Sequence, residues 1–492
     1  MEVHSNEKEN RKVNKKTKQK KKTNSNRQIM NVTYIFLLIF VMMTGYFVNY
    51  QMNEGAEIIN NAYNKREEIL AKSIIRGNIL SNDKTILAQT LTKEDGTEIR
   101  NYPYEQLFAH AVGYSTHGQT GIELLANYRL LTSNSPMLEI AADDLHGKKH
   151  IGDNVVTSLD ISVSEAAYQA MEGYKGAVIA IEPATGKIIT LISKPDFNPN
   201  VVADIYSDLI ADDNNSNLLN RATGGLYTPG STFKLFTLYE YIRENPDYED
   251  YHYDCNGSIS VDEYRIKCSG GAAHGEEDIY DSFAYSCNSS FVNMGLTLNK
   301  NAFVSTCKRL LFDSDLPIHF PYSQSEISLS EKSSVFETMQ TVMGQGKTLV
   351  TPIHLCMIAA AIANDGLLMK PYIVTSIENH NGKTIKTYHP SSYREILLPE
   401  ETAVLKKFLR SVVEYGTAKR LNTEKYIAYG KTGTAQIEDG SRNNSLFMGF
   451  AEQDGKKLAI CVVLEDTPEG TIPAVTVAKA VFDSYYFTNE NY

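Results

Sequence analysis

The chain has 492 residues, of which 42% are hydrophobic and 22% charged, and a formal net charge of -11. These values are typical of a globular protein with room for two or three domains, and they exclude a fibrous or wholly disordered chain. The acidic balance argues against nucleic acid as the main partner, because binding phosphates requires a basic surface.

The N-terminal segment, residues 1–29, is a basic arm. Between Lys8 and Arg27 it consists almost entirely of Lys, Arg, Asn, Thr and Gln, with very few apolar residues. Such a composition cannot build a core, so we expect this arm to be disordered.

An apolar stretch, residues 30–50, follows the arm. No charged residue lies between Arg27 and Glu54, and about 20 apolar residues suffice to cross a bilayer as a helix. The Lys and Arg residues that precede the stretch predict a cytoplasmic N-terminus and an extracytoplasmic remainder. A cleaved signal peptide would have a shorter apolar run and a small-residue cleavage site. We therefore expect an uncleaved, single-pass anchor in the cell membrane.

Beyond the anchor we expect two domains that meet near residue 150. In residues 51–150, two short strand patterns surround a turn, which indicates a small β-rich pedestal domain.

The larger domain, residues 151–492, contains apolar hairpin patterns at residues 176–193 and 445–466, with helical patterns between them. Strands from both ends of a region with helices inserted between them indicate an α+β fold. We expect a central, mainly antiparallel sheet covered by helices.

The stretch TPGSTFK, residues 228–234, contains a candidate nucleophile. Pro-Gly followed by a run of apolar residues predicts the start of a buried helix. Ser231 and Lys234 are three residues apart and share one helix face. The same Ser-x-x-Lys spacing occurs at Ser5, Ser81 and Ser305 without a buried helix, so the pair alone is weak evidence for a catalytic site.

Two further segments carry side chains suited to catalysis. Ser286 and Asn288 are two positions apart, although such a pair is often only a cap or turn. Lys431, Thr432, Gly433 and Thr434 lie on a predicted strand. Because glycine weakens a strand unless something approaches its backbone closely, we expect a substrate to lie along this strand.

In this order, the three segments resemble the motifs of the penicillin-recognising serine transpeptidases, and the chain is identified as a class B, monofunctional penicillin-binding protein. Five further segments carry the resemblance: Arg76-Gly77-Asn78-Ile79, Gly121-Ile122-Glu123, Asn220-Arg221-Ala222, Gly344-Gln345-Gly346 and Thr351-Pro352. The chain departs from the family at residues 81–84, where Ser-Asn-Asp-Lys replaces the usual Asp-Arg-x-Gly. It also lacks tryptophan, which often follows the third motif.

The resemblance implies a serine-type D-Ala-D-Ala transpeptidase that cross-links peptidoglycan stem peptides and is acylated by β-lactams. It implies a nucleophilic Ser231, a base in Lys234 and a proton relay through Ser286. Asn288 would fix Lys234 and bind the substrate amide, and Lys431 would supply positive charge. Thr432, Gly433 and Thr434 would form the strand that binds the substrate carboxylate, and the N–H groups of Ser231 and Thr434 would form an oxyanion hole.

A candidate structural zinc site comprises Cys255, Cys268, His274 and Cys287. Three thiolates and an imidazole suit tetrahedral zinc, and part of this pattern resembles a zinc-binding insertion of some cell-elongation members of the family. A Cys255–Cys268 disulfide is the alternative in an oxidising exterior. Since zinc is not general in the family, we expect no required cofactor.

Two other functions remain open at this point. One is a related hydrolase, either a β-lactamase or a D-Ala-D-Ala carboxypeptidase, and the other is a non-catalytic β-lactam-binding receptor. An anchor and a pedestal are not needed by a secreted β-lactamase, and all the catalytic residue types are present. As partners we expect stem peptides, β-lactams, the membrane and, from the family, a polytopic membrane glycosyltransferase.

Overall fold

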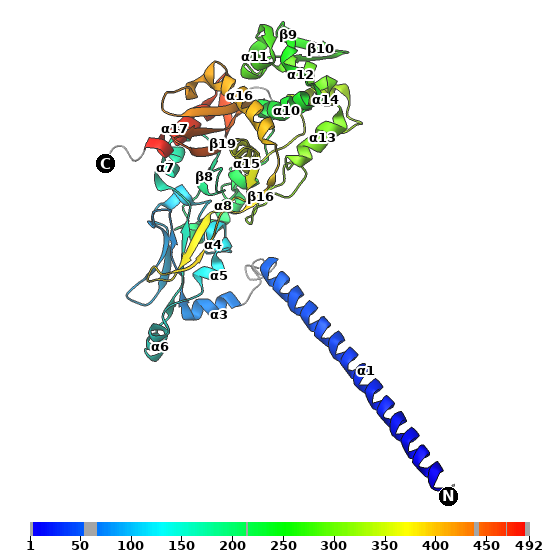
Figure 1. The fold of residues 1–492 in the computed structure, drawn as a ribbon. Helices are drawn as coiled ribbons and strands as arrows, with labels where there is room; N and C mark the ends of the chain where they lie inside the picture. Colours follow the sequence, from blue (N-terminus) through cyan, green and yellow to red (C-terminus); the bar gives the residue numbers. More distant parts are fainter. Residues whose placement is uncertain (1–2, 54–65, 213–214, 437–441, 469, 488–492) are drawn as a thin grey trace. The chain divides into compact units, whose positions relative to one another are not determined.

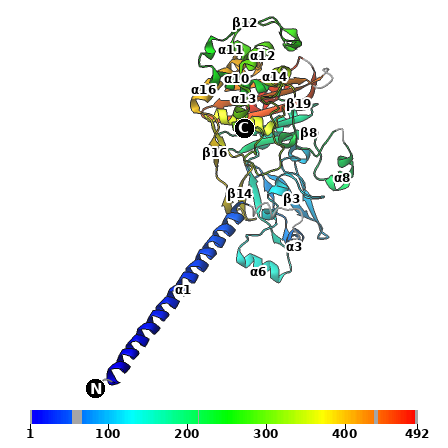
Figure 2. The ribbon, with the colours of Figure 1, turned by 90° about the vertical axis from the view of Figure 1, so that its right-hand side faces the viewer.

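The computed structural model describes residues 3–53, 66–212, 215–436, 442–468 and 470–487. The chain divides into two compact units, residues 1–66 and residues 67–492, which we describe separately. Figures 1 and 2 show their elements in two views.

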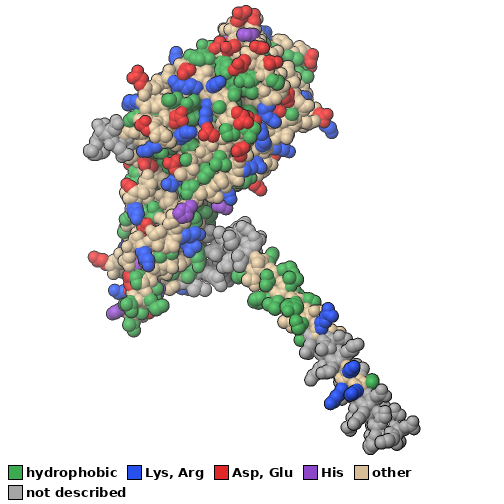
Figure 3. Space-filling view, in the orientation of Figure 1, with side chains coloured by type: hydrophobic (Ala, Val, Ile, Leu, Met, Phe, Trp, Pro, Cys, Tyr) green, Lys and Arg blue, Asp and Glu red, His purple; other side chains and the backbone are tan. Residues whose placement is uncertain are grey.

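Unit 1 contains one long helix, α1 (Val3–Asn53). Its stretch Arg27–Phe47 is apolar and long enough to cross a membrane, and its side chains are exposed (Figure 3). This candidate span overlaps the predicted anchor at residues 30–50. The arm that we expected to be disordered is helical from Val3 onward, in keeping with the high helix propensity of Lys, Arg and Gln.

Unit 2 contains a six-stranded sheet at its pedestal end (Figure 1). Its strand order is β15 (Thr384–Thr387), β14 (Val374–Glu378), β6 (Asn154–Thr157), β2 (Ile79–Leu80), β3 (Ile86–Thr92) and β4 (Glu98–Asn101). The sheet therefore joins strands from the predicted pedestal to strands that come much later in the chain.

A buried carboxylate, Glu123, lies at the centre of the pedestal. Its two oxygens pair with Arg76 at 2.6 Å and with Arg100 at 2.7 Å. Burial acts to raise the pKa of Glu123, but the charges of Arg100 and Arg76 outweigh it and hold this pKa below its usual value. The segments that contain Arg76 and Glu123, far apart in sequence, are thus two halves of one buried ion-pair cluster.

Smaller elements complete the pedestal. They are α3 (Arg66–Ser73), β1 (Ile74–Ile75), η1 (Glu105–Phe108), α4 (Gly121–Leu125), α5 (Asn127–Leu130), α6 (Met137–Leu145) and β5 (His150–Ile151), which pairs with β1.

The second large sheet has five strands, and every pair of neighbours is antiparallel. Its order is β17 (Ile427–Gln436), β18 (Arg442–Gln453), β19 (Lys456–Pro468), β7 (Gly176–Ile181) and β8 (Ile188–Lys194). Both predicted hairpins are confirmed, because β7 pairs with β8 and β18 pairs with β19.

Helices cover this sheet, as expected for the α+β fold. α15 (Pro352–Ala363) packs against β7, β18 and β19, while α17 (Pro473–Phe487) packs against β18, β19 and α7 (Ile161–Ala170). All residues from Leu458 to Leu464 of β19 are buried, so both faces of this strand are covered.

The other elements are α8 (Val202–Ala211), α9 (Arg221–Gly224), η2 (Gly230–Phe233), α10 (Lys234–Glu244), η3 (Tyr248–Asp250), β9 (His252–Cys255), β10 (Ser258–Val261), β11 (Tyr264–Lys267), η4 (Ser269–Gly271), β12 (Gly275–Asp278), α11 (Ile279–Ala284), α12 (Asn288–Thr297), α13 (Lys300–Arg309), α14 (Val335–Val342), β13 (Leu367–Met369), β16 (Ser392–Glu395), α16 (Pro399–Glu414) and η5 (Lys419–Leu421).

Candidate active site

Ser231 lies on the short 3-10 turn η2, which leads directly into α10, whose first residue is Lys234. The serine is partly exposed, whereas the lysine is fully buried. The predicted helix start after Pro229 is confirmed, with a first turn tighter than an α-helix. A partly exposed hydroxyl one turn from a buried amine is a suitable arrangement for a nucleophile and its base.

The nucleophile turn and strand β17 are in close contact at two glycines. Gly230 has a positive φ of 55°, and a Cβ there would lie 2.6 Å from the carbonyl oxygen of Thr434. A Cβ on Gly433 would lie 2.9 Å from the carbonyl oxygen of Pro229. We expected Gly433 to make room for a substrate, but its close neighbour is the chain's own backbone, and this contact aligns the third motif with the first.

Lys234 connects the first motif to the second. Its Nζ donates to the Ser286 carbonyl oxygen at 2.7 Å, to the Ser286 hydroxyl at 3.3 Å and to Asn288 Oδ1 at 2.7 Å. Burial lowers the pKa of Lys234 to about 8. At neutral pH an appreciable fraction of this amine is therefore uncharged and able to accept a proton.

Lys431, on β17, is the second buried lysine of the site. Burial and then the charge of Lys234 lower its pKa well below the usual value. Its Nζ lies 5.4 Å from the centre of the Phe283 ring, and Lys234 Nζ lies 5.3 Å from that of Phe291. The rings exclude water from the amines while providing weak cation–π stabilisation.

The threonines of the third motif have different neighbours. Thr432 Oγ1 lies 2.6 Å from Thr417 Oγ1, and the carbonyl oxygen of Thr434 accepts a bond from Gln345 Nε2 at 3.3 Å. Gln345 belongs to the Gly344-Gln345-Gly346 segment that resembles the family, but Thr417 carries no sequence signal. Phe283 and Phe291 were also missed, because aromatic residues beside a helical motif are usually only core.

Together these groups can perform acyl transfer. Ser231 supplies a nucleophile, Lys234 a base with a lowered pKa, and Ser286 a hydroxyl within hydrogen-bond reach of that base. The site therefore has the composition of a serine acyltransferase that uses lysine, rather than histidine, as its base.

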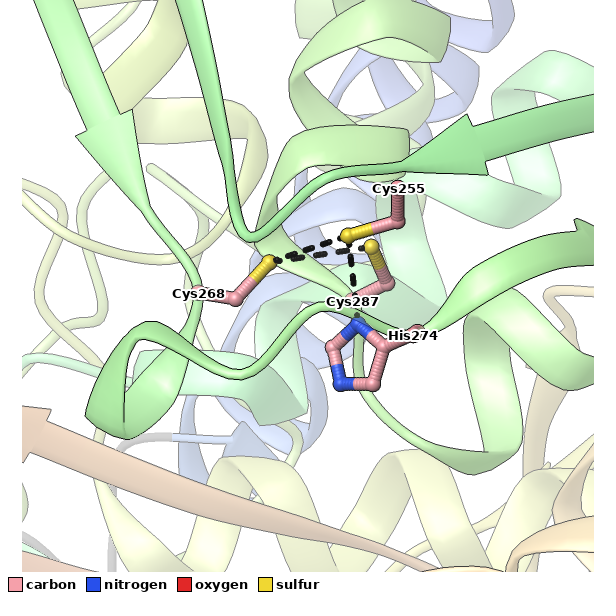
Figure 4. A group of neighbouring side chains, drawn as sticks. All are labelled: Cys255, Cys268, His274 and Cys287. Carbon is pink, nitrogen blue, oxygen red and sulfur yellow. Dashed lines mark hydrogen bonds between the residues drawn. The ribbon is translucent and has the colours of Figure 1, made fainter.

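Cys255, Cys268, His274 and Cys287 also converge, immediately beside the second motif (Figure 4). Their ligand atoms lie within 4.8 Å of one another. The sulfur atoms of Cys255 and Cys268 are 3.6 Å apart and those of Cys268 and Cys287 are 3.8 Å apart. Four ligands around zinc, with Zn–S distances near 2.3 Å, require S···S separations of about 3.8 Å, so the cluster fits tetrahedral zinc. A disulfide requires about 2.05 Å, and these cysteines are free.

The cluster is connected to the active site. Cys287 lies between Ser286 and Asn288, and its Sγ accepts a bond from the Ser290 backbone as the N-cap of α12. Asn288 Nδ2 donates to the carbonyl oxygen of Lys267, the residue before Cys268. The orientation of the second motif is thus held partly by the cysteine-containing insertion.

A carboxylate that the sequence did not indicate, Glu277, lies beside the cluster. It is 2% exposed, and neither carboxylate oxygen has a hydrogen-bond partner among the described residues. Its Oε1 lies 3.9 Å from His274 Nδ1, and burial raises the pKa of Glu277. A single acidic residue in a polar strand gives no sequence signal of such burial.

Comparison with known proteins is consistent with this geometry. Residues 176–483 match the penicillin-binding protein transpeptidase domain, and residues 76–155 match the penicillin-binding protein A dimerisation domain. The fold and site define a penicillin-recognising serine enzyme. The chain belongs to the penicillin-binding protein transpeptidase family, as its motifs predicted.

Individual relatives agree along most of the chain. Peptidoglycan D,D-transpeptidase PbpA of Mycolicibacterium smegmatis is 29% identical over 413 residues, which cover 80% of this chain and 84% of PbpA. The D,D-transpeptidase domain from Eggerthella lenta has a TM-score of 0.74 and 28% identity, covering 83% of this chain and 97% of that domain. The penicillin G acyl-enzyme of penicillin-binding protein A from M. tuberculosis has a TM-score of 0.75 and 26% identity, covering 84% and 100%.

Proposed function

We propose that this chain is a peptidoglycan D,D-transpeptidase that cross-links stem peptides through an acyl-enzyme on Ser231 and is covalently inhibited by β-lactams. The observation that carries the proposal is the contact of Lys234 Nζ with both Ser286 and Asn288, one helical turn from Ser231. The family match and the solved β-lactam acyl-enzymes of similar proteins support it.

In the acylation step, uncharged Lys234 accepts the hydroxyl proton as Ser231 Oγ attacks the carbonyl carbon between the two D-Ala residues. The N–H groups of Ser231 and Thr434 stabilise the resulting oxyanion, and one such donor is typically worth about 10²–10³ in rate. Ser286 relays the proton to the amine of the leaving D-Ala. Lys431 and Thr432 bind the substrate's terminal carboxylate.

The second step transfers the acyl group to an amine of a neighbouring stem peptide. This amine loses a proton to Lys234 as it attacks the ester, and Ser231 recovers its hydroxyl proton when the ester bond breaks. A β-lactam follows the first step alone, because the opened ring keeps its amine attached and blocks the acceptor's approach.

The intact mass of the full chain in detergent, measured after incubation with benzylpenicillin, tests the acyl-enzyme. We expect a slowly decaying adduct of one penicilloyl unit that is absent from Ser231→Ala. Ser305→Ala is a matched control, because Ser305 has the same spacing to Lys308 on α13 and should leave the adduct intact. No adduct contradicts the proposal, and rapid release of hydrolysed penicillin would favour a β-lactamase.

We also infer a single-pass topology with a cytoplasmic N-terminus, an extracytoplasmic unit 2, and a polytopic membrane glycosyltransferase as partner. The Lys and Arg residues before the candidate span support this orientation. Protease added outside intact cells should cleave within unit 2 but leave an epitope at the N-terminus intact. Cleavage of that epitope in intact cells would reverse the orientation.

We further propose that Cys255, Cys268, His274 and Cys287 hold one structural zinc ion. Zinc with four protein ligands would cross-link the segments that hold it and would have no open coordination position for a substrate. Its role here is to fix the insertion that supports Ser286 and Asn288. The proposal does not make zinc a participant in acyl transfer.

Metal analysis of the purified full chain tests the zinc site. We expect one zinc per chain, lost in Cys268→Ser and retained in Cys307→Ser, which alters another buried free cysteine outside the cluster. Cobalt exchanged into the site should give intense visible bands from its tetrahedral geometry and near-ultraviolet charge-transfer bands from its thiolate ligands. Absence of both zinc and cobalt bands in the wild-type chain would reject the site.

A further inference from the structure

Helix α6 turns its apolar side toward solvent. Met137, Leu138 and Leu145 are 84%, 87% and 86% exposed, and Ala141 and Ala142 are exposed between them. Their spacing of i, i+1, i+4, i+5 and i+8 places all five on one helix face. A surface helix normally buries such a face against the core, so α6 is oriented the opposite way.

Polar contacts on the other side of α6 hold this orientation. Glu139 Oε1 lies 2.7 Å from His380 Nε2, in the loop after β14. Asp144 Oδ1 lies 3.1 Å from His150 Nε2, in β5. The body of unit 2 thus partly covers Glu139 and Asp143, whereas Asp144 stays 67% exposed. Of the apolar residues of α6, only Ile140 is partly buried.

α6 lies close to α3, the first helix of unit 2 after the candidate membrane span. α6 is followed by β5, which pairs with β1, the strand that directly follows α3. Lys149 Nζ donates to the carbonyl oxygen of Ala71 in α3 at 3.1 Å. Figures 1 and 2 place α3 and α6 at the end of unit 2 opposite to α10–α14, and Figure 3 shows hydrophobic side chains gathered at this tip.

This end of unit 2 is tethered to the candidate membrane span. The span ends at Phe47 and unit 2 begins at residue 67. Because an extended chain covers at most about 3.6 Å per residue, this tip stays within tens of ångströms of the bilayer. The tether also keeps the effective concentration of α6 at the membrane high, so a weak contact suffices.

The size of the apolar face favours lipid over a protein surface. A helix of 9 residues is about 14 Å long and about 10 Å wide, an area of about 140 Å². A stable protein interface needs about 800 Å² from each partner. Lipid insertion has no such minimum, since each apolar side chain removed from water contributes by itself.

We infer that α6 lies in the headgroup–acyl boundary of the extracytoplasmic leaflet, as a second attachment of unit 2 to the membrane. Met137, Leu138 and Leu145 enter the apolar region, and the exposed basic residue Lys148, just beyond the helix, faces lipid phosphates. The inference rests on the proposed anchor and orientation but not on the transpeptidase chemistry.

Photocrosslinking of the full chain in nanodiscs of phosphatidylcholine and phosphatidylglycerol tests this attachment. Benzoylphenylalanine replaces Leu138 in one sample and Ile427 in a control, because Ile427 is an exposed apolar residue at the start of β17. We expect the yield of phospholipid adduct to be about tenfold higher at 138 than at 427. Leu145→Glu should reduce the yield at 138 toward the control value, because it places a charge in the apolar region.

The crosslinking yields decide whether α6 contacts lipid. Equal yields at the two positions, or no lipid adduct at 138, would overturn the inference. Crosslinks between two chains at 138 would replace it with a contact between copies. Acylation by benzylpenicillin, measured on the same samples, shows whether unit 2 is folded and separates failure of this inference from failure of the proposed enzyme activity.

Discussion

The pedestal and the active site both bury charged groups, but they treat them differently. In the pedestal, Glu123 pairs with Arg76 and Arg100, and every one of these side chains has a partner of opposite charge. In the active site, Lys234 and Lys431 are fully buried, and neither forms an ion pair with a carboxylate among the described residues. The comparison shows that compensated charges hold a fold together, whereas uncompensated ones are kept reactive by lowered pKa values.

The largest effect is expected from removing the uncompensated charge. Lys234→Met keeps most of the apolar part of the side chain but removes the base, so β-lactam acylation should slow by about 10³-fold. Stability should stay equal or rise, because a buried amine is costly. Stopped-flow acylation with a chromogenic β-lactam and thermal unfolding measure the two effects.

Lys308→Met is the control for this substitution, since Lys308 has the same Ser-x-x-Lys spacing but is exposed on α13. It should change neither measurement. If Lys234→Met lost stability rather than rate, the active site would resemble the pedestal and the comparison would fail.

Removing the paired carboxylate of Glu123 should lower stability and leave the acylation rate unchanged. Glu123→Gln leaves Arg76 and Arg100 without their carboxylate and should cost about 3–5 kcal/mol of unfolding free energy. Molecules that remain folded should be acylated at the normal rate. Urea unfolding measures this loss. Glu414→Gln is the control, because Glu414 forms a half-exposed pair with Arg410. The control should lose less than about 1 kcal/mol of unfolding free energy.

The acylation rate and the stability should both depend on pH through Lys234. Because the pKa of Lys234 is about 8, the uncharged base and the acylation rate should fall about tenfold for each pH unit below this value. The unfolded lysine binds protons up to its ordinary pKa of 10.5, so this group's contribution to stability should rise between pH 8 and that value. A rate that stays flat from pH 6 to 9 would assign the base elsewhere.

A smaller effect is expected at Thr417, whose hydroxyl lies 2.6 Å from that of Thr432 in the third motif. Thr417→Val removes one neutral hydrogen bond, worth about 0.5–1.5 kcal/mol. Acylation should slow by up to about tenfold, mainly through weaker β-lactam binding. A drop in the maximal acylation rate alone would mean that the bond serves the chemical step.

Sequence predicted those parts of the site that depend on short spacing. Ser231 and Lys234 share a helical turn, and Ser286 and Asn288 flank one residue, so local periodicity places each pair. The hairpins β7–β8 and β18–β19 follow from nearly continuous apolar runs on either side of turn residues.

What sequence could not predict depends on contacts between distant segments. Thr417 and Thr432 come from different elements, and the burial of Glu277 follows from packing around the cysteines. From the sequence, Gly433 was expected to make room for a substrate. Nothing in its own strand shows that the carbonyl oxygen of Pro229 approaches it. The helical form of the basic arm was also missed, since composition reports the lack of a core but not local helix propensity.

The six-stranded sheet of the pedestal affects how genes of this family can recombine. Strands β14 and β15 are encoded after residue 370, while β2, β3 and β4 are encoded before residue 102. A crossover near residue 150 that exchanges only the early part would join strands of different ancestry in one sheet, at the pairing of β2 with β6. Mosaic proteins of this family should therefore carry both segments from the same parent, or carry matched changes along that pairing.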